Sequence, residues 1–222
     1  MQVEVWADII CPWCGLGLHR LGTALAQFPH AGDVEVVHRS FQLDPSFPEG
    51  TVMPSLDMLR RKGLDEAQIT GSQRRIEEMA ASEGLTPYHV AGSQVGNTSL
   101  AHELLAYATA SGRHTEAWQG MFRAYFGEQR PVFDVPSLVS LAGELGLDPA
   151  GAQEALASRR YAGQVEADAR EAARLGATGV PFFVLGRRYG VSGAQPPGVM
   201  LEALQQAWSA THPPDPVPGA AS

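Results

Sequence analysis

The two cysteines of this 222-residue chain stand close together in the stretch DIICPWCG, residues 8–15. Only Pro12 and Trp13 separate Cys11 from Cys14. Thiols at this spacing can hold a metal, form a structural disulfide, or exchange electrons with other thiols. The rest of the sequence distinguishes these three chemistries.

Metal binding is the least supported of the three. A zinc site needs about four ligands, and structural sites usually pair one C-x-x-C with a second one. The chain has no other cysteine, and its seven histidines include no H-x3-5-H spacing. The pattern therefore predicts no metal site.

A structural disulfide would close a very short loop, so it would stabilise the fold little. Thiol–disulfide exchange has a better physical basis, because Cys11 lies where a strand gives way to a helix. Unpaired N–H groups and the helix dipole favour a thiolate there. Pro12 suits the first helical turn, and Cys14 follows one turn later on the same face. We therefore expect Cys11 to be the nucleophile and Cys14 to resolve the mixed disulfide.

Apolar periodicity predicts the elements that position this pair. Residues 2–10 and 34–41 read as strands, and residues 16–28 between them read as a helix, which together suggest a parallel pair with a crossover helix. Residues 52–175 read as helical almost throughout, with Asn97 as one N-cap and a last helix over 159–175. Residues 180–185 and 187–191 read as a hairpin, followed by a helix over 198–209. The layout is an α/β sheet interrupted by a helical insertion.

Composition narrows the classes of partner. The net charge of −8 and the pI near 5.3 argue against a nucleic-acid or anionic-membrane binder. No apolar run approaches the roughly 18 residues that span a bilayer. The N-terminus carries Glu4 and Asp8 within its apolar stretch, unlike a signal peptide. A cytoplasmic location is expected, where static disulfides are unusual.

The CPWC motif, the helical insertion and GVPFFV at residues 179–184 together resemble the DsbA-like branch of the thioredoxin superfamily. More narrowly, RSFQLDP (39–45), NTSLAH (97–102) and LGATGVPFFVLGRRYGVSGAQP (175–196) are similar to FrnE-type oxidoreductases. These are related to 2-hydroxychromene-2-carboxylate isomerases and kappa-class glutathione transferases. The resemblance implies a thioredoxin fold (β-α-β … β-β-α) with a large α-helical insertion.

The resemblance also implies a cis peptide before Pro181, with this proline facing the cysteines. The backbone of Val180 would then pair with an extended substrate. In domain terms, residues 1–50 and 159–210 would form the thioredoxin-like unit, residues 51–158 the insertion, and residues 211–222 a disordered tail.

Several further residues are candidates, each with an ordinary structural alternative. Asp8 could assist proton transfer to Cys14, or be an exposed acid at a strand end. Pro12 and Trp13 could cover the thiolate or contact substrate. The segment Gly193-Ala194-Gln195 could open the last helix and bind a carboxylate such as that of glutathione. For His38, Arg39 and His102, a structural role is the favoured interpretation.

Three functions remain open at this point. The first is a DsbA-like protein disulfide oxidoreductase or isomerase, acting on protein or small-molecule thiols and disulfides. It needs no cofactor, with glutathione as a candidate co-substrate. The second is a glutathione-dependent isomerase or transferase, although the isomerase relatives carry serine at the position of Cys11. The third is a non-catalytic holdase or small-ligand binder. The sequence leaves the oligomeric state open.

Overall fold

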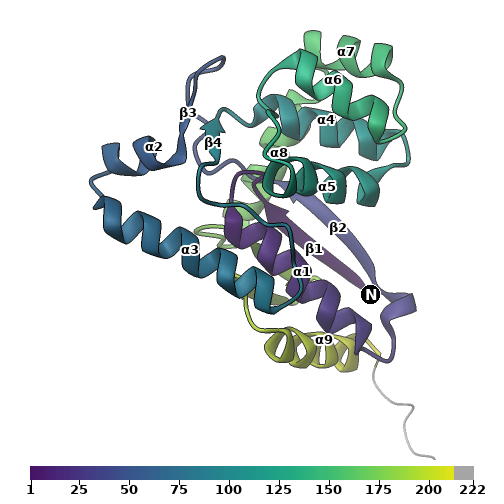
Figure 1. The fold of residues 1–222 in the computed structure, drawn as a ribbon. Helices are drawn as coiled ribbons and strands as arrows, with labels where there is room; N and C mark the ends of the chain where they lie inside the picture. The colour runs from purple at the N-terminus through teal and green to yellow at the C-terminus, as the bar shows by residue number, and fades with distance from the viewer. Residues whose placement is uncertain (213–222) are drawn as a thin grey trace, which may run out of the picture.

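The computed structural model describes residues 1–212, and its centre is a four-stranded sheet (Figure 1). The strands are β1 (Gln2–Ala7), β2 (Glu35–Ser40), β5 (Phe182–Leu185) and β6 (Tyr189–Ser192), in the order β2-β1-β5-β6. β1 pairs in parallel with β2 and antiparallel with β5, which in turn pairs antiparallel with β6. This is the predicted β-α-β … β-β-α order.

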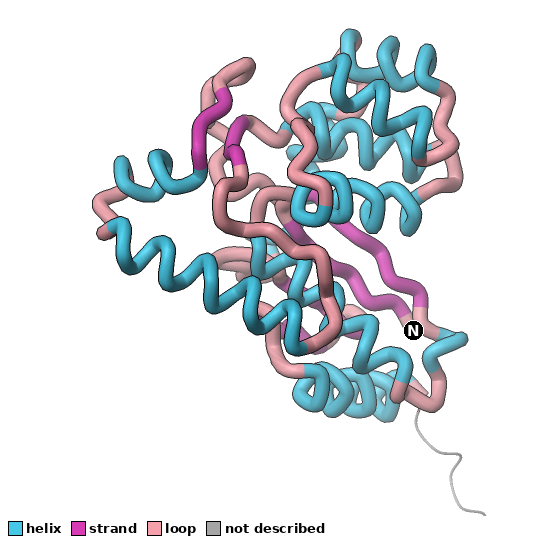
Figure 2. Tube along the Cα trace, in the orientation of Figure 1, coloured by secondary structure: helices cyan, strands magenta, loops and turns pink. Residues whose placement is uncertain are grey.

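The two faces of the sheet are covered by different helices, because side chains alternate along β1. Val3 and Val5 pack toward α1 (Pro12–Ala26) and α9 (Pro197–Thr211) in one apolar cluster. Trp6 points to the opposite face, where it packs with Phe182 and with Ala172 of α8 (Ala162–Arg174). Figure 2 shows the strands between these helices.

The insertion between β2 and α8 has two parts (Figure 1). The first is an arm formed by α2, α3 and a short antiparallel pair of strands, and the second is a bundle of four helices. The elements of the arm are β3 (Val52–Pro54), α2 (Ser55–Arg61), α3 (Glu66–Ser82) and β4 (Gln94–Gly96). The elements of the bundle are α4 (Ser99–Ala110), α5 (His114–Phe122), α6 (Val135–Glu144) and α7 (Pro149–Ala157). A short 3₁₀-helix at Ala31–Asp33 and a π-helix at Arg123–Gly127 complete the described elements.

Several predicted boundaries are wrong. β1 ends at Ala7 instead of residue 10, because the Asp8 carbonyl accepts the Cys11 N–H at 3.1 Å and turns the chain. α8 begins at residue 162 instead of 159, after Arg159 adopts a positive φ of 52°. Thr98, not Asn97, is the N-cap of α4, although the Asn97 side chain still accepts the Ser99 N–H.

The predicted disordered tail also needs correction. Helix α9 extends to Thr211, so the tail does not begin at that residue. Its remainder, residues 213–222, lies outside the described part of the chain. Within residues 1–212, no helix is both long enough and apolar enough to cross a bilayer.

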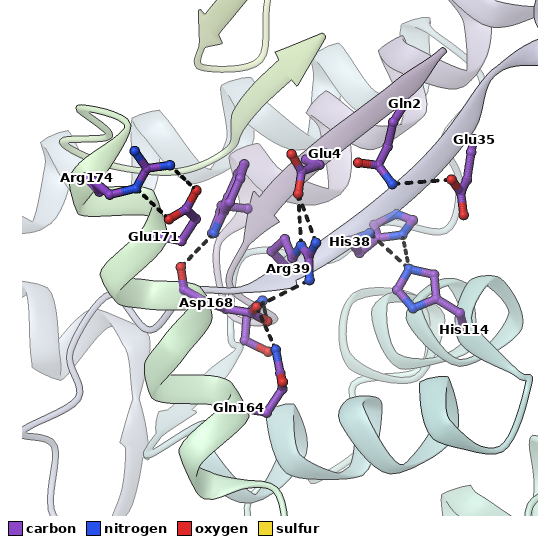
Figure 3. Close-up of polar contacts among 12 residues, drawn as sticks. Gln2, Glu4, Glu35, His38, Arg39, His114, Gln164, Asp168, Glu171 and Arg174 are labelled. Atoms are coloured by element: carbon purple, nitrogen blue, oxygen red, sulfur yellow. Dashed lines mark hydrogen bonds and ion pairs between the residues drawn. The ribbon is translucent and has the colours of Figure 1, made fainter. Parts of the chain in front are cut away.

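The outer edge of β2 is capped by side chains from two helices (Figure 3). The N–H groups of residues 35 and 41 donate to the carbonyls of Met1 and Ala7, so they face β1 and those of His38 and Ser40 point outward. The His38 N–H donates to His114 Nε2 at 2.9 Å, and the Ser40 N–H donates to Asp168 Oδ2 at 3.0 Å. Neither of these N–H groups is therefore open to another strand.

The thioredoxin-like unit and the insertion share one apolar core around the cysteines. Cys11 and Cys14 belong to the same buried cluster as Leu104, Trp118 and Phe126 of the insertion. The cysteine pair therefore lies where the two parts of the chain meet.

Candidate active site

Cys11 and Cys14 open helix α1 as two free thiols. Cys11 is the N-cap residue, with extended backbone angles of φ −84° and ψ 111°, and Pro12 follows within the first turn. The Cys14 N–H donates to the Cys11 carbonyl at 2.9 Å. Cys11 keeps 4% of its surface exposed, whereas Cys14 is fully buried. An outside reagent can therefore reach Cys11 more easily than Cys14.

The loop before β5 faces Cys11. The peptide between Val180 and Pro181 is cis, and the Cys11 thiol donates to the Val180 carbonyl at 3.6 Å. Pro181 packs closely on α1, because a Cβ added at Gly17 would lie 2.8 Å from Pro181 Cγ. The structure thus brings together Cys11, Val180 and Pro181, as the resemblance implied.

The thiol of Cys14 is held in its protonated form. Burial raises the pKa of Cys14 well above its ordinary value, and a hydrogen bond with Cys11 raises this pKa further. The charge of Asp8 acts in the same direction, while the Asp8 backbone opposes it. Cys14 therefore needs help to lose its proton before it can attack.

Asp8 is fully buried, so the alternative of an exposed acid at a strand end is wrong. Its Oδ2 accepts the Leu43 N–H at 2.8 Å, and its Oδ1 lies 3.3 Å from Nε2 of His102. His102 is also fully buried and comes from α4 of the insertion. Sequence reasoning treated this histidine as packing, although it lies in the quoted NTSLAH stretch.

Tyr88 is a second residue that sequence reasoning missed. Its hydroxyl donates to the Pro12 carbonyl at 2.5 Å, and its ring covers the helix at Gly15, where a side chain would overlap it. Burial raises the pKa of Tyr88 well above its ordinary value, so the phenol stays neutral. No motif in the sequence marks this residue, because the contact depends on how the insertion docks.

Pro12 and Trp13 line a cavity of about 570 Å³ between the cysteine helix and the arm of the insertion. Trp13 is 39% exposed at its rim. Most of the other lining side chains are apolar, among them Ile10, Phe47, Met58, Leu59, Ile69, Ile76, Val90 and Phe126. An apolar group of a substrate can therefore lie beside Pro12 and Trp13, the two residues between the cysteines.

The Gly193-Ala194-Gln195 segment does not open the last helix. It forms a loop before Pro196, and α9 begins at Pro197, where the missing N–H is tolerated. The Gly193 N–H donates to the Pro181 carbonyl at 2.8 Å, and the Gln195 N–H donates to the Gly193 carbonyl. These two N–H groups are therefore not available to a carboxylate.

The loop instead braces the Pro181 region. Arg20 of α1 donates to the Ala194 carbonyl at 2.5 Å and forms a salt bridge with Glu83 at the end of α3.

Within residues 1–212, no three His, Cys, Asp or Glu side chains are grouped as metal ligands.

A C-x-x-C pair at the start of a helix, facing a proline loop beside a four-stranded sheet, defines a thioredoxin-fold protein. The chain belongs to the DsbA-like thioredoxin domain family, which matches residues 2–205. The predicted family and the predicted fold with its helical insertion are therefore confirmed.

Two relatives are similar to this chain over most of its length. The crystal structure of a probable DsbA oxidoreductase from Streptomyces coelicolor is 45% identical, with a TM-score of 0.90, and the match covers 100% of this chain and 94% of that one. YwbO, an uncharacterized protein of Bacillus subtilis, is 30% identical over 84% of this chain and 87% of its own length.

More distant structures share the fold alone. A 2-hydroxychromene-2-carboxylate isomerase is 15% identical with a TM-score of 0.70, covering 95% of this chain and 98% of that one. A cytosolic disulfide reductase, DsbM of Pseudomonas aeruginosa, solved with GSH, is 20% identical with a TM-score of 0.59, covering 95% and 97%.

Proposed function

We propose that this protein is a thiol–disulfide oxidoreductase in which Cys11 attacks and Cys14 resolves. The observation that carries the proposal is the placement of the Cys11 thiol against the Val180 carbonyl, with the fully buried Cys14 one helical turn behind it. Cys11 is the one of the two that a substrate reaches first, and Cys14 is placed for an intramolecular second step.

The two steps balance without a cofactor. The Cys11 thiolate bonds to one sulfur of a substrate disulfide and releases the other sulfur as a thiolate. Cys14 then attacks the Cys11 sulfur, which forms the Cys11–Cys14 disulfide and releases the remaining substrate thiol. The substrate is reduced by two electrons and the protein is oxidised; the reverse sequence oxidises a dithiol.

Substrate recognition follows from the two surfaces beside Cys11. The Val180 carbonyl, which accepts from the Cys11 thiol in the free protein, would be open to an extended segment once that thiol reacts, and the cavity lined by Pro12 and Trp13 would take an apolar group of the substrate. Both protein segments and small disulfides meet these requirements. Glutathione is included as a co-substrate because a fold neighbour was solved with it, and that neighbour's cytosolic setting supports a cytoplasmic location here.

A glutathione-dependent isomerase is the second candidate, favoured by the shared fold with the 2-hydroxychromene-2-carboxylate isomerase. In that case Cys11 would position glutathione and Cys14 would take no part. The non-catalytic binder is the third candidate, supported by the apolar cavity. Binding to that cavity would then survive the loss of both thiols.

The Cys14→Ser variant separates these candidates. If the protein is a thiol–disulfide oxidoreductase, this variant should accumulate as a mixed disulfide with glutathione or a protein substrate. The reason is that it lacks the intramolecular resolving thiol, which has an effective molarity on the order of 10⁵ M or more. Mass spectrometry of the intact protein detects the adduct. Cys11→Ser is the matched control, and we expect it to form no adduct and to lose insulin reduction. Full exchange activity in Cys14→Ser without a trapped adduct would exclude the two-cysteine mechanism.

A further inference from the structure

Arg20 is a buried cation on the helix that carries the cysteines. Among residues 1–212 it is the one lysine or arginine that is buried, with 8% of its surface exposed. Burying a guanidinium is costly unless charged and hydrogen-bonding partners surround it. Its partners come from two segments that are distant in the chain, the end of α3 and the loop before α9.

The first partner is Glu83, the C-cap of α3 in the arm (Figure 1). Arg20 Nε donates to Glu83 Oε2 at 2.9 Å, and Arg20 Nη2 donates to Oε1 at 2.5 Å, so the pair is bidentate. These bonds hold the pKa of Glu83 below its ordinary value. His19 Nε2–H donates to the Glu83 carbonyl at 2.8 Å, so both the side chain and the main chain of Glu83 are bound to α1. The guanidinium is therefore fixed in one orientation.

The second partner is the loop between β6 and α9. The remaining guanidinium nitrogen of Arg20, Nη1, donates to the Ala194 carbonyl at 2.5 Å. Gly17 lies three residues before Arg20 on the same face of α1, and a Cβ there would lie 3.5 Å from Ala194 Cα. The neighbouring Gly193 N–H donates to the Pro181 carbonyl at 2.8 Å. A charged hydrogen bond thus holds the loop that in turn holds Pro181.

We propose that Arg20 is a positioning residue that fixes the Val180–Pro181 segment opposite Cys11. Glu83 orients Arg20 for this task, which makes the arm of the insertion part of substrate binding. This role rests on the proposed function, in which the Val180 carbonyl pairs with an extended substrate. Within residues 1–212, Arg20 forms no hydrogen bond with either cysteine. It therefore acts on the position of the bound segment and leaves the reactivity of the Cys11 sulfur unchanged.

Two disulfides of different size separate positioning from general damage. The first is the symmetric disulfide of a short peptide, which has a backbone that Val180 can bind. The second is 2-hydroxyethyl disulfide, which has no peptide backbone. Each is added in excess to the reduced protein in a Cys14→Ser background, and mass spectrometry of acid-quenched samples measures the rate at which the Cys11 adduct forms.

For Arg20→Met, which keeps most of the side-chain length without its donors, we expect attack on the peptide disulfide to slow about tenfold. Attack on 2-hydroxyethyl disulfide should change less than about threefold, because it needs no pairing with the loop. An Arg20→Met protein that slows both attacks equally, or neither, would overturn the proposal.

Arg39→Met is the matched control. Arg39 is a half-buried arginine that also binds a glutamate, Glu4, through two nitrogens. It lies on β2, which β1 separates from β5 and Pro181. Urea unfolding measures the stability of both variants, and we expect Arg39→Met to be destabilised without a change in the ratio of the two attack rates. A ratio that falls as far in Arg39→Met as in Arg20→Met would also overturn the proposal.

Glu83 is tested by Glu83→Gln, which keeps an oxygen acceptor and removes the charge that holds the guanidinium. We expect the rate with the peptide disulfide, relative to that with 2-hydroxyethyl disulfide, to fall about threefold. The double variant should be no slower than Arg20→Met alone, because the two residues act through one contact. Multiplied losses in the double variant would overturn the role given to Glu83. If Arg20→Met does not fold, an unchanged ratio in folded Glu83→Gln overturns the proposal.

Failure of the proposed function would give a different result. If the Cys14→Ser protein forms no adduct with either disulfide, and the wild-type protein forms no Cys11–Cys14 disulfide, thiol exchange itself is refuted. If exchange occurs and the rate ratio is unchanged in Arg20→Met, only the positioning role is refuted.

Discussion

At the scale of single residues, the two thiols differ in solvent exposure, and burial raises the pKa of one of them, Cys14. Cys11 retains a small exposed fraction, whereas Cys14 is fully buried and burial raises its pKa. We therefore expect iodoacetamide to label Cys11 of the reduced protein well before Cys14 across pH 5–8. Peptide mass spectrometry over a pH series measures both rates. Faster labelling of Cys14 at low pH would reverse the assignment of nucleophile and resolving thiol.

The residues that sequence reasoning found differ from those it missed in their separation along the chain. Cys11, Cys14 and Asp8 lie within seven residues of one another, so a strand-to-helix turn places them together. His102 and Tyr88 reach the same site from the insertion, and their position depends on how its helices dock. No local pattern encodes that docking, which is why a buried histidine was read as packing.

At the scale of elements, helix α1 carries a glycine, Gly17, at the point where Pro181 packs against it. A Cβ at Gly17 would lie 2.8 Å from Pro181 Cγ and 3.3 Å from Phe183 Cζ, so Gly17→Ala must displace the loop that faces Cys11. We expect this variant to lose about 1–3 kcal/mol in the free energy of unfolding, as for overpacking, and to exchange thiols more slowly. Urea unfolding and a glutathione-disulfide assay measure the two effects.

Gly22 on the same helix supplies the control for this prediction. An added Cβ there meets nothing within 4 Å. Gly22→Ala should therefore stabilise the protein by about 0.5–1 kcal/mol through helix propensity and leave exchange unchanged. If both alanine variants behave alike, close approach of Pro181 is not the reason for Gly17.

Element prediction from sequence succeeded for the main elements of the sheet, including the short β5–β6 hairpin, and failed for the β3–β4 pair. The apolar pattern of α1 and the β-branched pattern of β1 and β2 gave the right elements. The β3–β4 pair has three residues in each strand, too few for a period of two to stand out. The Gly193–Gln195 segment was misread because Pro196-Pro197 delays the start of α9 until after the loop.

At the scale of the whole molecule, two histidines at the capped edge of β2, His38 and His114, make the free energy of unfolding depend on pH. Burial, together with the neighbouring His114, lowers the pKa of His38 to about 3. Burial and the charge of Arg39 also lower the pKa of His114, whose Nε2 must stay unprotonated to accept the His38 N–H. The unfolded chain binds protons at these sites below about pH 6.5, before the folded chain does.

The sign of the pH effect follows from this difference. The His38 contribution is complete above pH 6.5 and is lost as the pH falls toward 3, at up to about 1.4 kcal/mol per pH unit. Chemical unfolding between pH 7 and pH 4 measures this loss. The slope should be shallower for His38→Phe, which keeps the stacking on Trp118, and unchanged for His89→Gln at an exposed site. Equal slopes for His38→Phe and wild type would contradict the prediction.

The sequence contains two cysteines, and both belong to the proposed redox pair. A count of free sulfhydryls in the denatured protein therefore reports the redox state directly. Two free thiols correspond to the reduced protein, one to a mixed disulfide, and none to the intramolecular disulfide. Any covalent dimer joined through sulfur must likewise consume Cys11 or Cys14, so disulfide-linked assembly and full two-thiol activity exclude each other.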